Sequence, residues 1–368
     1  MTKKKLRVGV LFGGRSGEHE ISLLSAASVL RALDPTRYEV IPIGITKEGR
    51  WIASGDPLAA LSGGALQLAG TEVTLFADPS TPGALNVRGS AEQPALAVDL
   101  FLPVLHGPFG EDGSLQGLLE LAGVPYVGSG VLASSTGMDK GAMKALFRDA
   151  GLPVAPGTVF LRREWESDPD GVRMRCEREL GYPLFIKPAN MGSSVGISKV
   201  RSADELPAAF ESACAYDRRI LAEAAIQNAR EIEVAVLGND DPVSSVPGEI
   251  RPSREFYDYE AKYEDAASEL LIPAPLPDEI VKTIGEMSIR CFKALDCAGL
   301  ARVDFLIRES DNEVFVNEIN TMPGFTAISM YPKLWQASGV SYSELLDRLI
   351  KLALERHEDR GRNRIDYR

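Results

Sequence analysis

The first residues of the chain read as a strand, a glycine-rich turn, a helix and a second strand, and this order constrains the fold more than any other feature. Residues 6–12 are an apolar run, residues 13–17 hold three glycines, residues 20–33 show apolar positions at helical spacing, and residues 38–43 are apolar again. This order predicts a doubly wound α/β unit. The turn lacks the G-x-G-x-x-G pattern, which disfavours a dinucleotide-binding dehydrogenase.

Length and charge limit the class of protein. The 368 residues, 45% hydrophobic and 25% charged, suit a globular chain of two or three domains. A net charge of −12 without a long basic block disfavours nucleic acid as a partner. No apolar run reaches the ~18 residues that predict a membrane span. The four cysteines lack metal-binding or paired spacing and predict free thiols in the cytoplasm.

Several segments predict elements around a ligand site. Residues 96–105 predict one apolar strand that ends in the polar loop 106–113, at the strand end where α/β sheets bind ligands. Residues 52–95 carry no motif and predict surface insertions or an extra hairpin. Asp139 predicts the N-cap of a helix over 139–150. Ser341 and Glu344 form a capping box that predicts a C-terminal helix through Arg356.

A loop of small residues between two short strands is the first candidate ligand site. Residues 187–196 hold two glycines and two serines, and apolar segments at 184–186 and 197–200 flank them. Because no helix and no G-K-[ST] sequence follow, the pattern predicts a hairpin flap and not a Walker A loop. The backbone amides of such a loop can close over a phosphate chain, and Lys187 can reach a phosphate oxygen.

A pair of strands predicts a metal site. Residues 302–307 and 314–320 alternate at period two and are joined by turn residues. Two antiparallel strands would bring Asp304, Glu318 and Asn320 onto one face, next to Arg302. Two carboxylates and one amide oxygen are typical ligands of Mg²⁺ or Mn²⁺ and not of Zn²⁺.

Four other segments stay open on the residues alone. Residues 256–263 fit a lid with a phosphate-binding lysine or an exposed loop. Glu18, at the start of the first helix, fits a helix-dipole contact or a ligand for a substrate ammonium. His106 fits a structural histidine or a site residue. A turn at Gly324 could direct its backbone N–H toward a developing oxyanion.

Taken together, these stretches resemble the D-alanine–D-alanine ligases of the ATP-grasp superfamily. The matching residues are 13–22, 106–113, 187–196, 256–263 and 302–326, in the family's order and across nearly the whole chain. The resemblance implies an α/β, three-domain ATP-grasp architecture. Its parts would be an N-terminal Rossmann-like domain at 1–135, a central subdomain with the flap at 136–230, and a C-terminal subdomain with the lid and metal site at 231–368.

The resemblance also implies a nucleotide site. It assigns Lys140, Lys187 and Lys262 to the phosphates of ATP, Glu223 to the adenine amino group and Glu231 to the ribose. Ala224 follows Glu223 where several relatives carry lysine.

For the metal and the reaction centre, the resemblance implies further roles. Asp304, Glu318 and Asn320 would hold two Mg²⁺ or Mn²⁺ ions. Arg302 and the Gly324 amide would stabilise a tetrahedral intermediate.

The remaining implied roles concern the amino-acid substrates. Glu18 would bind the ammonium of the first D-alanine in a triad with Ser193 and Tyr263, and His106 would lie near that substrate. Ser329 and Met330 would line the carboxylate side of the second D-alanine.

The implied activity is ATP-dependent joining of two D-alanines through a D-alanyl phosphate, for peptidoglycan precursors, by a cytoplasmic homodimer. Alternatives are a D-alanine–D-lactate or D-serine ligase, another ATP-grasp carboxylate–amine ligase, and a nucleotide-binding regulator without catalysis. Relatives that make D-lactate products lack the Tyr257, Lys262 and Tyr263 pattern, so its presence favours an amine acceptor.

Overall fold

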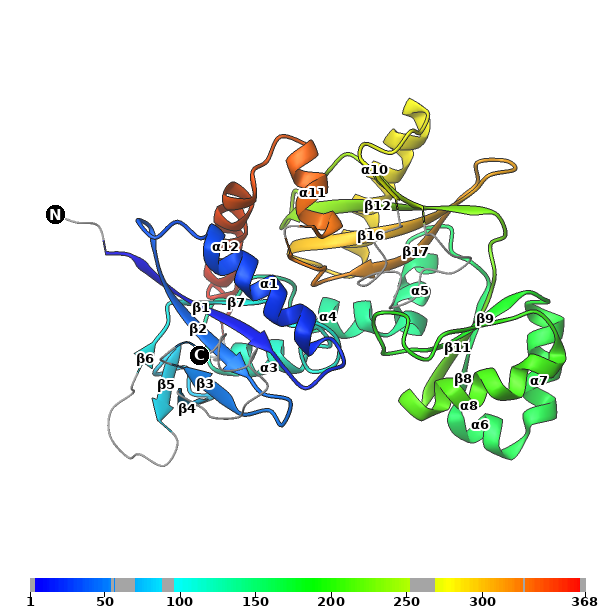
Figure 1. Cartoon of the computed structure of the whole chain (residues 1–368), viewed down its shortest axis with the longest axis horizontal. Helices are drawn as coiled ribbons and strands as arrows, with labels where there is room; N and C mark the ends of the chain where they lie inside the picture. Colours follow the sequence, from blue (N-terminus) through cyan, green and yellow to red (C-terminus); the bar gives the residue numbers. More distant parts are fainter. Residues whose placement is uncertain are drawn as a thin grey trace.

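The computed structural model describes residues 4–53, 56, 70–87, 96–251, 269–326 and 328–364. Helices and strands mix throughout these residues, and the strands form three sheets in succession along the chain (Figure 1). The predicted α/β class is therefore confirmed. No helix among the described residues has the length and apolar character needed to cross a bilayer.

The first sheet has a parallel centre and an antiparallel extension. Strand β1 pairs in parallel with β2, as the opening pattern predicts, and it also pairs in parallel with β7. The extension pairs β2 to β6 in sequence and contains the hairpin expected within residues 52–95. The strands are β1 (Leu6–Gly13), β2 (Tyr38–Ile45), β3 (Trp51–Ala53), β4 (Thr71–Leu75), β5 (Ala84–Val87), β6 (Leu96–Ala97) and β7 (Leu100–Pro103). The helices that follow β1 and β7 are α1 (His19–Ala32), α3 (Ser114–Leu121) and α4 (Val131–Met138).

The prediction of one strand over residues 96–105 is wrong. Two short strands, β6 and β7, lie there, at opposite edges of the sheet. Between them, the Val98 N–H donates to Gly83 O at 3.0 Å, whereas the Asp99 N–H donates to Arg7 O at 2.8 Å. Because neighbouring residues bond to different strands, the sheet must curl until its two edges approach each other.

The second sheet carries the flap. Its strands are β8 (Gly157–Leu161), β9 (Leu184–Pro188), β10 (Ser198–Val200) and β11 (Arg219–Ala224), in the order β10-β9-β11-β8. Strands β9 and β10 are antiparallel, so residues 189–197 form the predicted hairpin loop. The helices of this part are α6 (Arg162–Ser167), α7 (Pro169–Glu179) and α8 (Leu206–Tyr216), preceded by a 3₁₀ turn at Ala203–Glu205.

The third sheet contains the predicted metal ligands Asp304, Glu318 and Asn320. Its strands are β12 (Ala229–Gly238), β13 (Val243–Ser244), β14 (Gly248–Arg251), β15 (Glu269–Leu271), β16 (Gly299–Arg308) and β17 (Val314–Asn320). Helices α5 (Lys140–Asp149) and α10 (Asp278–Ala294) pack on its apolar face. The Asp139 carboxylate accepts from the Ala142 N–H at 2.9 Å, which confirms the predicted N-cap of α5.

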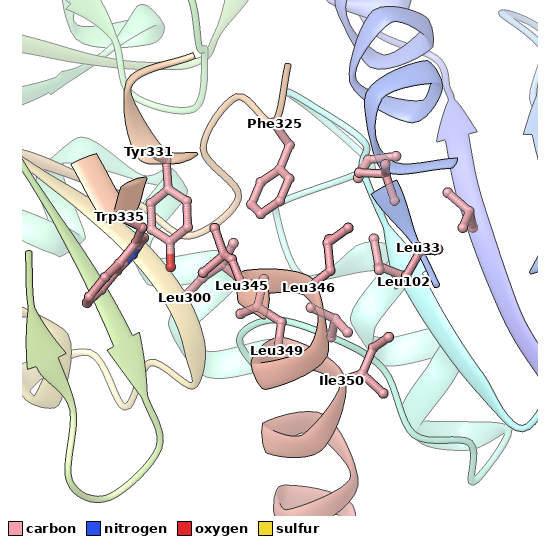
Figure 2. Close-up of a cluster of buried hydrophobic side chains, with 14 of the residues drawn as sticks. Leu33, Leu102, Leu300, Phe325, Tyr331, Trp335, Leu345, Leu346, Leu349 and Ile350 are labelled. Atoms are coloured by element: carbon pink, nitrogen blue, oxygen red, sulfur yellow. The ribbon is translucent and has the colours of Figure 1, made fainter. Parts of the chain in front are cut away.

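A hydrophobic cluster joins the first and third sheets (Figure 2). Helix α12 (Tyr342–Arg360) inserts Leu345 and Leu349 between Leu102 of β7 and Leu300 of β16, while α11 (Met330–Ala337) adds Tyr331. The Ser341 hydroxyl accepts from the Glu344 N–H at 3.3 Å, so α12 begins at the predicted cap, and it ends four residues beyond Arg356. This cluster therefore holds the first and third sheets together.

Candidate active site

One face of the third sheet is polar and the opposite face is apolar. Asp304 and Glu318 lie directly opposite each other on β16 and β17, and Arg302 lies opposite Asn320. Side chains alternate along a strand, so these four share one face. The intervening residues, such as Val303, are buried against the helices on the other face. The strand pairing therefore places these four residues on one face of the sheet, as the sequence pattern predicts.

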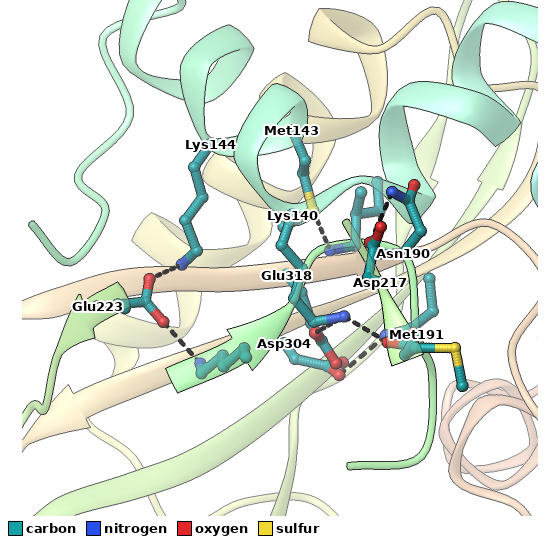
Figure 3. A network of polar contacts seen from close by, with 12 residues as sticks. Lys140, Met143, Lys144, Asn190, Met191, Asp217, Glu223, Asp304 and Glu318 are labelled. Carbon is teal, nitrogen blue, oxygen red and sulfur yellow. Dashed lines mark hydrogen bonds and ion pairs between the residues drawn. The ribbon is translucent and has the colours of Figure 1, made fainter. Parts of the chain in front are cut away.

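The four polar side chains contact one another. Asn320 Nδ2 donates to Asp304 Oδ2 at 3.0 Å. Arg302 donates through Nε and a terminal nitrogen to the two oxygens of Asp304, each at 2.6 Å. From α5, Lys140 Nζ lies 4.0 Å from Glu318 Oε2 (Figure 3). Two cations thus neutralise the two carboxylates.

The oxygens of Asp304, Glu318 and Asn320 fit a hard divalent cation by their chemistry. Where the chain is described, no group of three or more His, Cys, Asp or Glu residues could hold a metal. The predicted metal ligands Asp304, Glu318 and Asn320 include only two residues of those types, and therefore do not form such a group. A bound ion would compete with Arg302 and Lys140 for the same carboxylates.

Arg302 is held from two sides. Its Nε, which donates to Asp304, also lies 3.0 Å from Glu233 Oε2. Glu233 is on β12 and lies directly opposite Asp304. Burial opposes the charged form, but Asp304 and Glu233 outweigh it and raise the pKa of Arg302 further above its usual range. The guanidinium is therefore a fixed positive charge above the sheet.

Lys140 connects the flap to the sheet. Its Nζ donates to the Met191 carbonyl at the beginning of the flap at 2.7 Å, and it also faces Glu318 (Figure 3). Asn190, the residue before Met191, donates through Nδ2 to Asp217 at 3.0 Å. The base of the flap is thus anchored both to Lys140 and to Asp217.

A second charged group lies one helical turn further along α5, at Lys144. Glu223 on β11 accepts from Lys187 Nζ at 2.6 Å and is also ion-paired with Lys144 (Figure 3). Burial opposes the charged form of Glu223, but the two lysines outweigh it and lower the pKa of this carboxyl. Two residues assigned to ATP, Lys187 and Glu223, therefore contact each other directly.

The tip of the flap reaches the first sheet. The Ser193 hydroxyl donates to the Glu18 carboxylate at the start of α1. Ser193 and Ser194 have positive φ angles of 48° and 59°, and a Cβ atom at Gly192 would lie 2.8 Å from Glu18 Oε2. A small residue is therefore required where the flap approaches Glu18. Two members of the proposed triad are in contact, and Tyr263 lies outside the described residues.

The loop after β7 contributes His106 and Glu111. The His106 ring is buried, with Nε2 3.2 Å from Ser25 Oγ and Nδ1 3.3 Å from Met322 O. Burial lowers the pKa of His106, although Glu18 opposes this effect. The Glu111 carboxylate accepts from the Gly107 N–H at 2.7 Å, and burial together with the nearby Glu18 raises its pKa to about 8.

The loop after β17 leads to the start of α11. Ser329 Oγ accepts from the Thr326 N–H at 3.1 Å, and a Cβ atom at Gly324 would lie 3.0 Å from the same oxygen. The Met330 side chain is buried in the hydrophobic cluster, so only its backbone faces the loop. The first amides of α11 are oriented as a helix N-terminus that favours a carboxylate.

Of the remaining predicted residues, Glu231 lies near the beginning of β12, a central strand of the third sheet. Glu231 shares the polar face of β12 and lines an open hollow of about 440 Å³ beside Arg230 and Glu249. Lys262, like Tyr263, falls outside the described residues.

Three site residues have no predicted role: Lys144, Glu233 and Glu111. Lys144 lies one helical turn after Lys140, and Glu233 lies two strand positions after Glu231, so each shares a face with a predicted residue. Glu111 belongs to the loop that contains His106. Periodicity could have found Lys144 and Glu233, and membership of the polar loop could have found Glu111.

Comparison with protein families gives matches along nearly the whole chain. Residues 7–129 match the family described as D-ala D-ala ligase N-terminus, and residues 146–351 match the family described as D-ala D-ala ligase C-terminus. The chain is 53% identical over 364 residues to a D-alanine--D-alanine ligase of Natranaerobius thermophilus, covering 99% of each chain. It is 53% identical to the one from Geobacillus thermodenitrificans, covering 97% of each.

Solved structures give the same result. The D-alanine-D-alanine ligase from Coxiella burnetii matches with a TM-score of 0.85 at 37% identity, covering 98% of this chain and 97% of that one. The VanG D-Ala:D-Ser ligase from Enterococcus faecalis matches with a TM-score of 0.85 at 38% identity, covering 95% and 100%.

Proposed function

Because the chain belongs to the D-alanine–D-alanine ligase family, we propose that it joins two D-alanine molecules into D-alanyl-D-alanine while ATP is converted to ADP and phosphate. The product is the dipeptide unit of peptidoglycan precursors. The contact that carries the proposal is the hydrogen bond from Ser193 to Glu18, because it brings the flap to the carboxylate that is predicted to bind the substrate ammonium. The fold of the family is ATP-grasp.

The reaction needs an activated carboxylate. A carboxylate oxygen of the first D-alanine attacks the γ-phosphorus of ATP, ADP leaves, and a D-alanyl phosphate forms. The amine of the second D-alanine then attacks the acyl carbon, phosphate leaves, and the amine loses a proton. Closure of the flap excludes water, which would otherwise hydrolyse the acyl phosphate.

Charged side chains of the site are available to bind ATP in this reaction. We propose that Lys140, Lys187 and Lys262 bind the ATP phosphates, Glu223 the adenine and Glu231 the ribose. The burial of Lys140 and its contact with the flap carbonyl of Met191 support its share.

For the substrates, we propose that Glu18 holds the first ammonium with Ser193 and Tyr263, and that the neutral ring of His106 lies near this substrate. Ser329 and the backbone of Met330 would receive the second carboxylate at the start of α11. Arg302, clamped by two carboxylates, would stabilise the tetrahedral intermediate together with the Gly324 amide.

Asp304, Glu318 and Asn320 would hold two Mg²⁺ or Mn²⁺ ions. When bound, such ions neutralise phosphate charge and orient the phosphoryl group.

We also propose three domains, with bounds 1–135, 136–230 and 231–368. The three sheets support this division, and β12 begins at Ala229, two residues before the last bound.

A cytoplasmic homodimer completes the proposal. The four cysteines are unpaired, which suits a reducing compartment. Leu121 and Leu132, on the adjacent helices α3 and α4, are 65% and 58% exposed and could form part of a dimer contact. Sedimentation of the purified protein tests the dimer, and a monomer at micromolar concentration would contradict it.

The test of the function is phosphate release from Mg·ATP, with products identified by mass. We expect release with D-alanine and none with L-alanine, and a product of D-alanyl-D-alanine mass. Mixtures of D-alanine with D-serine or D-lactate test the acceptor, since one similar structure is a D-Ala:D-Ser ligase. A mixed dipeptide or an ester as the main product would reassign the acceptor, and absence of turnover with every mixture would refute the proposal.

A further inference from the structure

Helix α5 directs two buried lysines toward the nucleotide site. Lys140 and Lys144 lie one helical turn apart and are 8% and 2% exposed. Lys140 faces the flap and Glu318, whereas Lys144 faces Glu223 (Figure 3). Burying an ammonium is costly unless a partner compensates it, so the second lysine requires a reason.

Glu223 is shared between two lysines. Its Oε1 is ion-paired with Lys144 and its Oε2 accepts from Lys187 at 2.6 Å. Two ammonium groups therefore face one carboxylate, which leaves one positive charge in excess. This excess suits a site that receives an anionic ligand.

The two lysines differ in what they can do when a nucleotide binds. Lys187 lies at the end of β9, where the flap begins, and can turn toward a phosphate. Lys144 is enclosed within the protein, and Glu223 is its ion-pair partner among the described residues. The Nζ of Lys144 and the Oε1 of Glu223 make no further hydrogen bond there, so both retain bonding capacity for a ligand.

We propose that Lys144 is a positioning residue for nucleotide recognition, which holds the Glu223 carboxylate ionised and oriented toward the adenine amino group while Lys187 turns to the phosphates. The inference rests on the proposed function, because the roles of Glu223 and Lys187 belong to it.

The arrangement selects adenine over guanine. An ionised carboxylate only accepts hydrogen bonds, so it pairs with the exocyclic amino group of adenine and repels the O6 acceptor of guanine. Without Lys144, Glu223 either takes up a proton, and can then donate to that acceptor, or stays bound to Lys187. The first outcome weakens the selection against GTP, and both weaken the binding of ATP.

The first test is Lys144→Met, which keeps the length of the side chain and removes its charge. We expect the KM for ATP to rise about tenfold or more, as for loss of a charged hydrogen bond. The KM for D-alanine and kcat at saturating ATP should change less than twofold, and the preference for ATP over GTP should fall. Arg148→Met, one turn further along the same helix at an exposed position, is the matched control and should leave all values unchanged.

The second test asks whether Lys144 acts through Glu223. Glu223→Gln alone should raise the KM for ATP and reduce the preference for ATP over GTP. Adding Lys144→Met to Glu223→Gln should change the KM by less than twofold further. The double variant also removes both buried charges, so it serves if Lys144→Met alone fails to fold.

The outcomes separate the inference from the function on which it rests. If Glu223→Gln leaves ATP recognition unchanged, the adenine assignment is wrong. If Glu223→Gln alters ATP recognition but Lys144→Met does not, the positioning role alone is overturned. Equal effects of Lys144→Met with and without Glu223→Gln would also overturn it, because they would show an independent role.

Discussion

Replacing Glu111 by glutamine should change how the stability of the protein depends on pH. Partial burial of the carboxyl and the nearby Glu18 raise its pKa from 4.5 to about 8. The folded chain therefore holds a proton that the unfolded chain has released between these two values. It follows that the free energy of unfolding falls as pH rises from about 4.5 to 8.

The size of this effect follows from the two pKa values. The difference, 8 − 4.5, corresponds to at most about 5 kcal/mol. Glu111 is partly exposed, so solvent screening reduces this value, and we expect about 2–3 kcal/mol. Glutamine cannot ionise, but it keeps the oxygen that accepts from the Gly107 N–H.

The assay is urea unfolding of wild type and Glu111→Gln at pH 5 and at pH 8.5. We expect the variant to gain stability relative to wild type at the higher pH. Glu286→Gln, on the exposed face of α10, is the control and should show no such difference. Parallel pH profiles of Glu111→Gln and wild type would refute the assignment of a raised pKa.

Three further predictions concern the metal, the flap and the core. Asp304→Asn should reduce phosphate release at least ~100-fold through loss of metal binding; near-normal turnover at low Mg²⁺ would contradict this. Ser193→Ala, which loses the bond to Glu18, should raise the KM for D-alanine several-fold while ATP binding, measured by calorimetry, stays constant; unchanged D-alanine kinetics would exclude Ser193 from the site. Tyr331→Phe removes the 3.0 Å bond to the Val236 carbonyl and should cost about 1–2 kcal/mol in urea unfolding, which an unchanged midpoint would contradict.

Sequence periodicity predicts most of the local structure, because neighbouring residues decide it. Strand alternation brings Asp304, Glu318 and Asn320 to one face, and the caps at Asp139 and Ser341 begin their helices where predicted. These features depend on short-range spacing, which one sequence displays in full.

Long-range pairing is what the sequence does not show. The break between β6 and β7 arises because Val98 and Asp99 bond to strands at different places in the sheet, while the apolar run over both is continuous. Likewise, the ion pair of Glu223 with Lys144 joins residues far apart in the chain. Charge type alone cannot predict which partner such a lysine selects.

Transfer of a heavy oxygen isotope tests the proposed reaction most directly. All of the D-alanine carries the label in both carboxylate oxygens, and the inorganic phosphate that is released is examined by mass spectrometry. An acyl phosphate intermediate transfers one carboxylate oxygen to phosphorus, so each phosphate should carry one labelled oxygen. Unlabelled phosphate, or label in AMP, would contradict phosphoryl activation of D-alanine by this protein.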